Sequence, residues 1–404
     1  MNVAIVHDYL NQYGGAERVL EALHELYPHA PVYTSVYAPT VMPTAYQSWD
    51  IRTSFMQRLP FVARRHQFYF PLYAQAFERF DFNAYDLVLS SSSAWAKGVI
   101  TGPQTLHVCY CHAPMRFVWG MHDYLRGESV GQLGRGILPF ALSYVRLWDS
   151  VSASRPDEYI ANSQETARRI AKYYRRAATV IPPPVDLRGF QPAPPGEIED
   201  YYLVVARLVP YKRVDAVITA FNRLGYRLKV VGDGRQRAEL EALAGPNIEF
   251  LGKVSQEALR TLYARCRALV WAEAADFGIT PVEAQAAGRP VIAYGAGGAL
   301  ETVVAGVTGR FFSAQTPDAI VAAVLAAEGD HYDSARIRRH AEQFSTAVFG
   351  QRIRQFVDAH WAARPDQRVA ISDPPIDLSP DLRPMERVPG PASLPAPLYQ
   401  APDI

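Results

Sequence analysis

Three loops of the sequence combine residue types that could hold a phosphate-bearing ligand. The first is the stretch HDYLNQYGGAER, residues 7–18, in which Gly14 and Gly15 separate an apolar run from a helix expected to begin near Ala16. Glycines at a helix start expose backbone N–H groups, which favour an anion. Taken alone, a Gly-Gly pair is also compatible with an ordinary turn between a strand and a helix.

The second loop carries two cations five residues apart, Arg207 and Lys212, directly after the apolar run that ends at Val205. Fixed positive charge at the carboxyl end of a strand suits a diphosphate leaving group, whose negative charge grows as its bond to the transferred group breaks. A solvated basic loop is the alternative interpretation.

The third loop lies between Glu273 and Ala284, after an apolar run that ends near Trp271. Gly278 frees the backbone, and Pro281 suits the first turn of a helix whose N-terminus would again present N–H groups to an anion. Glu283 falls within about the first turn and is predicted to face the ligand. It could equally stabilise the helix dipole.

Short apolar runs alternate with amphipathic stretches on both sides of these loops, which predicts parallel strands joined by crossover helices. We therefore expect an α/β protein with two Rossmann-like domains that face each other across a cleft, with ligands at the carboxyl ends of the strands. The expected strands are Val3–Val6, Leu87–Ser90, Leu106–Cys111, Tyr159–Asn162 and Thr179–Pro182, then Tyr201–Val205, Arg227–Val231, Ile248–Phe250, Ala268–Trp271 and Pro290–Ala293.

Proline-rich segments set the expected boundaries of this organisation. Pro182–Pro184 and residues 191–196 predict an interdomain linker, because proline cannot extend the interior of a sheet or a helix. Beyond about Arg364 the sequence is rich in proline and poor in large apolar residues, which predicts a disordered tail, with a recognition segment as the alternative.

Composition narrows the classes of function. A formal net charge of +1 on 404 residues provides no global field that would favour nucleic acid. Three cysteines, of which Cys109 and Cys111 should point the same way from one strand, are too few for a zinc site and suit a reducing compartment. No run of about 20 apolar residues is present, and the N-terminus lacks a basic leader, so we expect a cytoplasmic protein.

From Met1 to about Ala362 the order of these motifs resembles the retaining family-4 glycosyltransferases of the GT-B fold. The matching stretches are Gly14-Gly15, residues 161–163 (ANS), residues 181–186 (IPPPVD), Arg207 with Lys212, residues 232–234 (GDG), residues 277–284 (FGITPVEA), residues 288–293 (GRPVIA) and residues 297–301 (GGALE). The resemblance implies an N-terminal acceptor domain over residues 1–185 and a nucleotide-sugar donor domain over 186–345. It also implies a helix over 346–363 that packs back on the first domain, before the tail at 364–404.

The resemblance also implies roles for individual residues. Arg207 and Lys212 would hold the donor diphosphate and stabilise it as it leaves, so that neither a metal nor another cofactor is needed. Glu283 would hold the ribose hydroxyls, and His112 would approach the donor sugar. Further donor contacts are expected at Gly14, Gly15, Gly232, Asp233, Phe277, Gly278, Ile279 and Thr280.

One position departs from the family pattern, which carries two glutamates eight residues apart. The partner of Glu283 would be residue 275, which is Ala275. The missing carboxylate normally contacts sugar hydroxyls and supports positive charge near the anomeric carbon. Glu273 and Asp276 are close enough in sequence to substitute for it; if neither does, the chain is a catalytically silent nucleotide-sugar-binding relative.

Within the family, residues 114–119 (PMRFVW) and the stretch around Phe277 are similar to bacterial O-antigen and exopolysaccharide mannosyltransferases, which use GDP-mannose. A UDP-sugar donor is the alternative. Arg58, Arg64 and Arg65 lie among aromatic residues, as on surfaces that meet anionic lipid headgroups, although a partly buried helical region would look the same. A glycan acceptor, either free or linked to polyprenyl diphosphate, and peripheral contact with the inner membrane surface are therefore expected.

Overall fold

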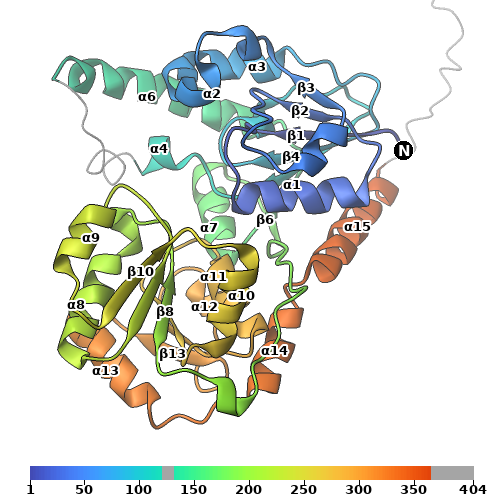
Figure 1. Cartoon of the computed structure of the whole chain (residues 1–404). Coiled ribbons are helices and arrows are strands. Elements are labelled where there is room, and N and C mark those ends of the chain that lie inside the picture. Colours follow the sequence, from blue (N-terminus) through green and yellow to red (C-terminus); the bar gives the residue numbers. More distant parts are fainter. Residues whose placement is uncertain (121–131, 365–404) are drawn as a thin grey trace, which may run out of the picture. The chain divides into compact units, whose positions relative to one another are not determined.

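The computed structural model describes residues 1–120 and 132–364, without the side chains of residues 132–139. Residues 1–363 form one compact unit built around two parallel sheets (Figure 1). None of the helices within the described ranges combines the length and the apolar character needed to cross a membrane. The tail predicted to be disordered lies, from residue 365 onward, outside the described residues.

The first sheet has seven strands in the order β3-β2-β1-β4-β5-β6-β7, and every pairing is parallel. Its strands are β1 (Val3–His7), β2 (Val32–Thr34), β3 (Ile51–Thr53), β4 (Leu87–Ser92), β5 (Leu106–Cys111), β6 (Glu158–Ala161) and β7 (Thr179–Val180). The helices around it are α1 (Gly15–Leu26), α2 (Val62–Arg65), α3 (Tyr73–Glu78), α4 (Arg116–Trp119), α6 (Gln132–Ser152) and α7 (Gln164–Tyr173), with 3₁₀ helices η1 (Thr44–Ser48), η2 (Phe55–Arg58), η3 (His66–Leu72) and η4 (Ala96–Gly98).

The second sheet has six parallel strands in the order β10-β9-β8-β11-β12-β13. They are β8 (Tyr202–Val205), β9 (Leu228–Val231), β10 (Ile248–Gly252), β11 (Leu269–Trp271), β12 (Val291–Tyr294) and β13 (Gly309–Phe312). The helices around it are α8 (Val214–Leu224), α9 (Arg237–Leu243), α10 (Gln256–Arg265), α11 (Ile279–Ala286), α12 (Ala299–Thr302), α13 (Pro317–Ala327) and α14 (Ser334–Glu342), with 3₁₀ helices η5 (Pro195–Glu197) and η6 (Pro210–Lys212). The last helix, α15 (Thr346–Ala362), packs on the first sheet.

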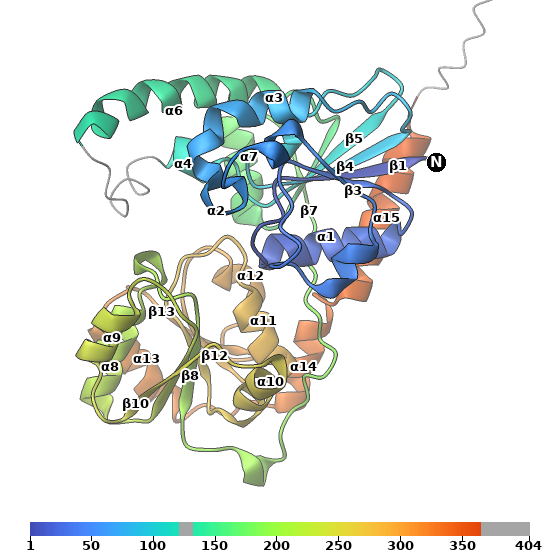
Figure 2. The same cartoon turned by 45° about the horizontal axis from the view of Figure 1, so that its top comes forward.

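Alternating side chains of the first sheet bury two different faces. Val3 and Ile5 of β1 share a core with α1 and with Phe349 and Ile353 of α15. Ala4 and Val6 of the same strand point to the opposite face and pack against α3, α4 and α6. Figure 2 shows α1 and α15 together on their side of this sheet. Both faces are therefore covered by helices, as a parallel sheet requires.

The second sheet is built in the same way. Leu203 and Leu269 face a core shared with α10, α11 and α14, while Val204 and Val270 face α8, α9 and α13. Because each strand is buried on both faces, its sequence reads as a continuous apolar run, which is why these strands were detectable from sequence.

All ten strands predicted from the sequence are present, with ends shifted by up to two residues. The prediction missed β2, β3 and β13; β3 and β13 each contain an arginine, which interrupts the apolar run. The chain passes from the first core to the second between Ile181 and Val185. The crossing thus falls at Pro182–Pro184, before the second proline-rich stretch of the predicted linker.

Candidate functional site

The site elements lie where the strand order of each sheet reverses. In the first sheet β1 stands between β2 and β4, and in the second sheet β8 stands between β9 and β11. The loops that follow two such neighbouring strands run in opposite directions, which leaves room for a ligand at the carboxyl ends of the strands. His7 ends β1, and Arg207 and Glu273 follow β8 and β11.

Arg207 and Lys212 follow β8, as predicted. The Lys212 ammonium forms an ion pair with the carboxylate of Glu273, which is buried in the loop after β11. Arg207 is exposed, and its Nη2 donates to the Tyr211 hydroxyl at 2.8 Å. The neighbouring loop therefore holds Lys212, whereas the guanidinium of Arg207 faces solvent, where it can meet an anionic ligand.

The stretch Gly232-Asp233-Gly234 packs against the backbone of the Arg207 loop. A Cβ at Gly232 or Gly234 would overlap the carbonyl groups of Ala206 and Leu208, and Gly232 has φ +128°. The Leu208 amide donates to the Asp233 carbonyl at 3.0 Å. These glycines therefore let one loop lie close against the other, which sets the position of Arg207.

The third predicted loop leads into α11. Gly278 is its N-cap with φ +96°, and a Cβ there would lie 2.7 Å from the Trp271 ring, so only glycine fits. The first residues of the helix, Ile279 and Thr280, present their backbone N–H groups at its N-terminus. A Cβ at Gly15 would lie 3.0 Å from Ile279 Cδ1, which brings the two predicted glycine loops into contact.

Glu283 of α11 is buried, and both of its carboxylate oxygens accept hydrogen bonds. Arg18 Nη1 of α1 donates to Oε1 at 2.8 Å, and the Tyr263 hydroxyl donates to Oε2 at 2.9 Å. Burial raises the pKa of Tyr263 well above its usual value, so the phenol keeps its proton for this bond. Both oxygens of Glu283 are therefore held in place by hydrogen-bond donors from α1 and α10.

His112 follows β5 and takes part in a chain of side chains at the ends of three neighbouring strands. Its Nε2 lies 2.8 Å from Ser91 Oγ, which lies 3.1 Å from His7 Nδ1, and His7 Nε2 lies 3.5 Å from Glu17. Burial, with a smaller contribution from His7, lowers the pKa of His112 from its usual 6.5 to about 3. His112 is therefore a neutral imidazole at pH 7.

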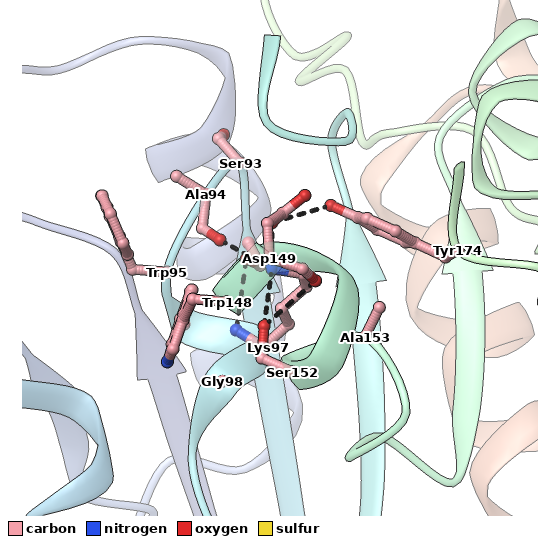
Figure 3. Close-up of polar contacts among 12 residues, drawn as sticks. Ser93, Ala94, Trp95, Lys97, Gly98, Trp148, Asp149, Ser152, Ala153 and Tyr174 are labelled. Carbon is pink, nitrogen blue, oxygen red and sulfur yellow. Dashed lines mark hydrogen bonds and ion pairs between the residues drawn. The ribbon is translucent and has the colours of Figure 1, made fainter. Parts of the chain in front are cut away.

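Asp8 fixes the loop after β4. Its two carboxylate oxygens accept the backbone N–H groups of residues 93–96 at 2.6–3.0 Å. Lys97, at the end of this loop, is buried and pairs with Asp149 of α6 at 2.5 Å (Figure 3). Asp149 also accepts from Trp119 Nε1 at 2.6 Å and from the Tyr174 hydroxyl at 3.2 Å. One carboxylate thus holds segments that follow β4, β5 and β6.

The loop around Ala275 shows what surrounds the missing glutamate. Asp276 is buried and held by two arginines, with Arg169 Nη1 at 2.6 Å from Oδ1 and Arg116 paired with Oδ2. Glu273 is held by Lys212. Both carboxylates that the sequence offered as substitutes are therefore engaged by cations, and Ala275 itself is partly buried.

The structure thus brings Arg207, Lys212 and the residues of the Glu273–Glu283 loop to one sheet edge, and His112 to the corresponding edge of the first sheet. Arg58, Arg64 and Arg65 are exposed on η2 and α2, away from these loops in sequence and without an ion pair among the described residues. Within the described ranges, no group of three or more His, Cys, Asp or Glu residues could hold a metal ion.

Sequence reasoning missed four residues of the site. Arg18 and Asp8 lie within the quoted glycine-loop stretch but received no role, and Arg116 and Arg169 stand on helices after β5 and β6. The available signal was their place just after strand ends. Their partners are more than 80 residues away in sequence, so the pairing itself could not be predicted.

Comparison with known families agrees with this architecture. A model described as Glycosyltransferase Family 4 matches residues 13–188, and a model described as Glycosyl transferases group 1 matches residues 190–344. The two models together cover every strand of the two sheets except β1.

Several curated proteins are similar to parts of the chain. A D-inositol 3-phosphate glycosyltransferase of Geodermatophilus obscurus is 32% identical over 53% of this chain and 54% of its own length. A GDP-mannose-dependent alpha-(1-6)-phosphatidylinositol monomannoside mannosyltransferase of Mycobacterium tuberculosis is 30% identical over 52% of this chain and 62% of its own length. In these two matches the chain spans little more than half the length of its curated relatives.

Solved structures share the fold. HepE of Anabaena, solved in complex with UDP, has a TM-score of 0.67 at 18% identity and covers 89% of this chain and 100% of its own. Sucrose-phosphate synthase of Thermosynechococcus elongatus also has a TM-score of 0.67 at 18% identity, over 90% of this chain and 100% of its own. The two-sheet architecture is therefore that of GT-B glycosyltransferases.

Proposed function

Because the chain belongs to the family-4 glycosyltransferases, we propose that it transfers mannose from GDP-mannose, with retention of configuration, to a glycan or a polyprenyl-diphosphate-linked glycan. The observation that carries the proposal is the set of groups that follow the two strands at the switch point of the second sheet: Arg207 and Lys212 after β8, and Glu273 and the helix α11 with Glu283 after β11. Two relatives whose names specify GDP-mannose support the choice of donor.

In this mechanism the bond between the anomeric carbon and the diphosphate oxygen breaks, and its electron pair goes to the diphosphate. Arg207 and Lys212 stabilise that charge. The acceptor hydroxyl attacks the same face, and its proton passes to the departing phosphate oxygen, which gives GDP and the mannosylated acceptor. Glu273 and Asp276 are both paired with cations, and we assign neither of them the role of a covalent nucleophile.

Glu283 would accept hydrogen bonds from the ribose hydroxyls. Since Oε1 already accepts from Arg18, a ribose at this oxygen has to share it with the guanidinium or displace it. His112, neutral at pH 7, would contact a hydroxyl of the donor sugar as a hydrogen-bonding partner and not as a cation.

The donor assignment is tested by thermal denaturation with GDP-mannose and with UDP-glucose. We expect GDP-mannose to raise the midpoint more, since a ligand that binds only the folded state stabilises it by about 2.7 kcal/mol at a hundredfold excess over its dissociation constant. Lys212→Ala should reduce the shift. The control is Lys253, an exposed lysine after the edge strand β10, where Lys253→Ala should leave the shift unchanged. A shift with UDP-glucose and none with GDP-mannose would overturn the assignment.

A silent nucleotide-sugar-binding protein is the second candidate, and Ala275 is the observation that favours it. With Glu273 and Asp276 held by cations, the loop has no spare carboxylate for the sugar. An assay of GDP release from GDP-mannose separates the candidates. Donor binding without any release or transfer would favour the silent protein.

We also propose that Arg58, Arg64 and Arg65 touch the anionic surface of the inner membrane. Next to these exposed cations, the side chains of Phe61 and Phe68 are 79% and 77% exposed. Exposed rings beside cations suit the interface of an anionic bilayer. Sedimentation with phosphatidylglycerol vesicles should be lost when all three arginines become glutamine. Equal sedimentation with phosphatidylcholine vesicles would contradict this surface.

A further inference from the structure

The half of the molecule built on the first sheet contains a cavity of about 350 Å³ that none of the roles above uses. Its walls are mainly aromatic and include Tyr9, Phe70, Tyr73, Trp95 and Phe117. The volume is at the small end of the range for pockets that bind small molecules. Its lining includes residues just after β1 and β4, and these two strands carry His7 and the Asp8-bound loop at their ends.

The walls are held in place by contacts of their own. Trp95 and Tyr73 stack with ring centroids 5.1 Å apart, and the Tyr73 hydroxyl lies 2.7 Å from His66 Nδ1. His66 in turn packs on Tyr9 at 4.7 Å. The Trp95 amide donates to Asp8 at 2.8 Å. Side chains fixed in this way form a cavity of defined shape, which costs a ligand little ordering entropy.

The chemistry of the lining favours an uncharged, apolar ligand. Among the described residues, no Asp, Glu, Lys or Arg side chain lines the cavity. Burial lowers the pKa of His66, so its ring is neutral at pH 7. A sugar would need several hydrogen-bonding partners here, whereas a hydrocarbon chain needs only the rings.

Two cations directly precede lining residues in the chain. Arg64 and Arg65 immediately precede His66 and Gln67, are exposed, and form no ion pair in the part of the chain that the structure describes. Guanidinium groups suit phosphate oxygens. An apolar cavity next to two unpaired cations matches a molecule with a phosphate head and a hydrocarbon chain.

We propose that this cavity binds the first apolar section of a lipid phosphate, whose phosphate contacts Arg64 and Arg65. The proposal deepens the proposed function, because it names the lipid end of the acceptor. In that case the glycan head would extend from the phosphate toward the ends of β1, β4 and β5, where His112 lies. The cavity thus selects acceptors by their lipid.

The test measures binding by calorimetry on the full chain, without donor, with geranyl phosphate, geraniol and inorganic phosphate as probes. We expect geranyl phosphate to bind, geraniol to bind more weakly and inorganic phosphate not to compete. The double variant Arg64→Gln/Arg65→Gln should weaken the binding of geranyl phosphate and leave the binding of geraniol unchanged. Competition by inorganic phosphate at similar concentration would mean a simple anion site and overturn the proposal.

Two variants fill the cavity, and a third variant serves as their control. Leu142→Trp adds volume from α6, and Gln67→Trp adds it from an exposed position, where folding is not at risk. Both variants should raise the dissociation constant of geranyl phosphate by about tenfold or more. Leu147→Trp, on the same helix but 63% exposed and outside the cavity lining, should bind as the wild type does. Wild-type binding in both filled variants would overturn the proposal.

The outcome is independent of the donor assignment. Thermal stabilisation by the sugar nucleotide should be the same in Gln67→Trp as in the wild type, because Gln67 is exposed and is not among the residues assigned to the donor. If geranyl phosphate binds but GDP-mannose does not, the donor proposal fails and the lipid site stands. If the donor binds and geranyl phosphate does not, the lipid site fails alone.

Discussion

The buried pair of Lys97 and Asp149 offers a quantitative test of how the first sheet positions its loops. The two side chains are 1% and 0% exposed, and their charged atoms lie 2.5 Å apart. Lys97 Nζ also donates to the Ala94 carbonyl at 3.0 Å and to Ser152 Oγ at 3.3 Å (Figure 3). Neither charge can reach water, so each depends on the other.

Removal of one partner should therefore be costly. Asp149→Asn keeps the size and one carbonyl acceptor but leaves the Lys97 ammonium buried without a counter-charge, which costs about 3–5 kcal/mol. The free energy of unfolding of a whole domain is about 5–15 kcal/mol, so this loss is a large part of it. Lys97→Met should cost a similar amount by stranding the carboxylate. The double variant Lys97→Met/Asp149→Leu should cost less than the sum, because no charge then remains buried.

Hydrogen exchange measured by mass spectrometry localises the effect. Peptides that cover residues 92–98 and 112–119 should lose about a hundredfold or more of their protection in Asp149→Asn, since about 1.4 kcal/mol corresponds to a factor of ten. Peptides of the second sheet should be unchanged. The control is the exposed pair Arg223–Asp318, also at 2.5 Å but 55% and 86% exposed, where Arg223→Met should change stability by less than about 1 kcal/mol. Equal effects at the two pairs, or strictly additive losses at the buried one, would refute the reasoning.

Further perturbations test the site itself. Arg207→Ala and Lys212→Ala should each lower GDP release by about a hundredfold, while EDTA leaves wild-type activity intact. Arg207→Ala should leave the melting temperature nearly unchanged, whereas Lys212→Ala should also lower it, because the buried Glu273 carboxylate then loses its counter-charge. Undiminished release in both variants would remove these cations from the mechanism. Because His112 has a pKa of about 3 in the folded protein and an ordinary value of 6.5 when unfolded, its contribution to the free energy of unfolding is complete above about pH 6.5. That contribution is lost as the pH falls toward 3, so urea titrations of His112→Gln should show a shallower loss than the wild type, and parallel curves would contradict the assignment. Gly278→Ala should destabilise the protein by about 1–3 kcal/mol, since φ is +96° and the added Cβ would meet a tryptophan ring; an unchanged urea midpoint would show that the loop relaxes freely. Ala275→Glu should raise transfer modestly at most and leave donor binding unchanged, whereas a wild type that binds donor without turnover and is activated by this substitution would refute catalysis by the natural sequence.

The strands, the two-sheet organisation and the glycine loops could be predicted from the sequence because their signals are local. Strands buried on both faces appear as apolar runs, as at Leu106–Cys111, whose predicted and observed bounds coincide. The glycines at 278 and 232 are needed by their own backbone conformations and by close contacts with nearby loops. The cations after β8 could be placed because a strand end is visible in the sequence.

The strand order and the partners of the charged residues were decided only by the tertiary structure. Nothing in the sequence near Glu283 indicates that Arg18 binds it from 265 residues away, or that Asp276 is held by arginines of α4 and α7. The aromatic cavity likewise combines segments after β1 and β4 with η3, α4 and α6. Local propensity and hydrophobic period act over a few residues, whereas Coulomb attraction and packing act between side chains that only the folded chain brings together.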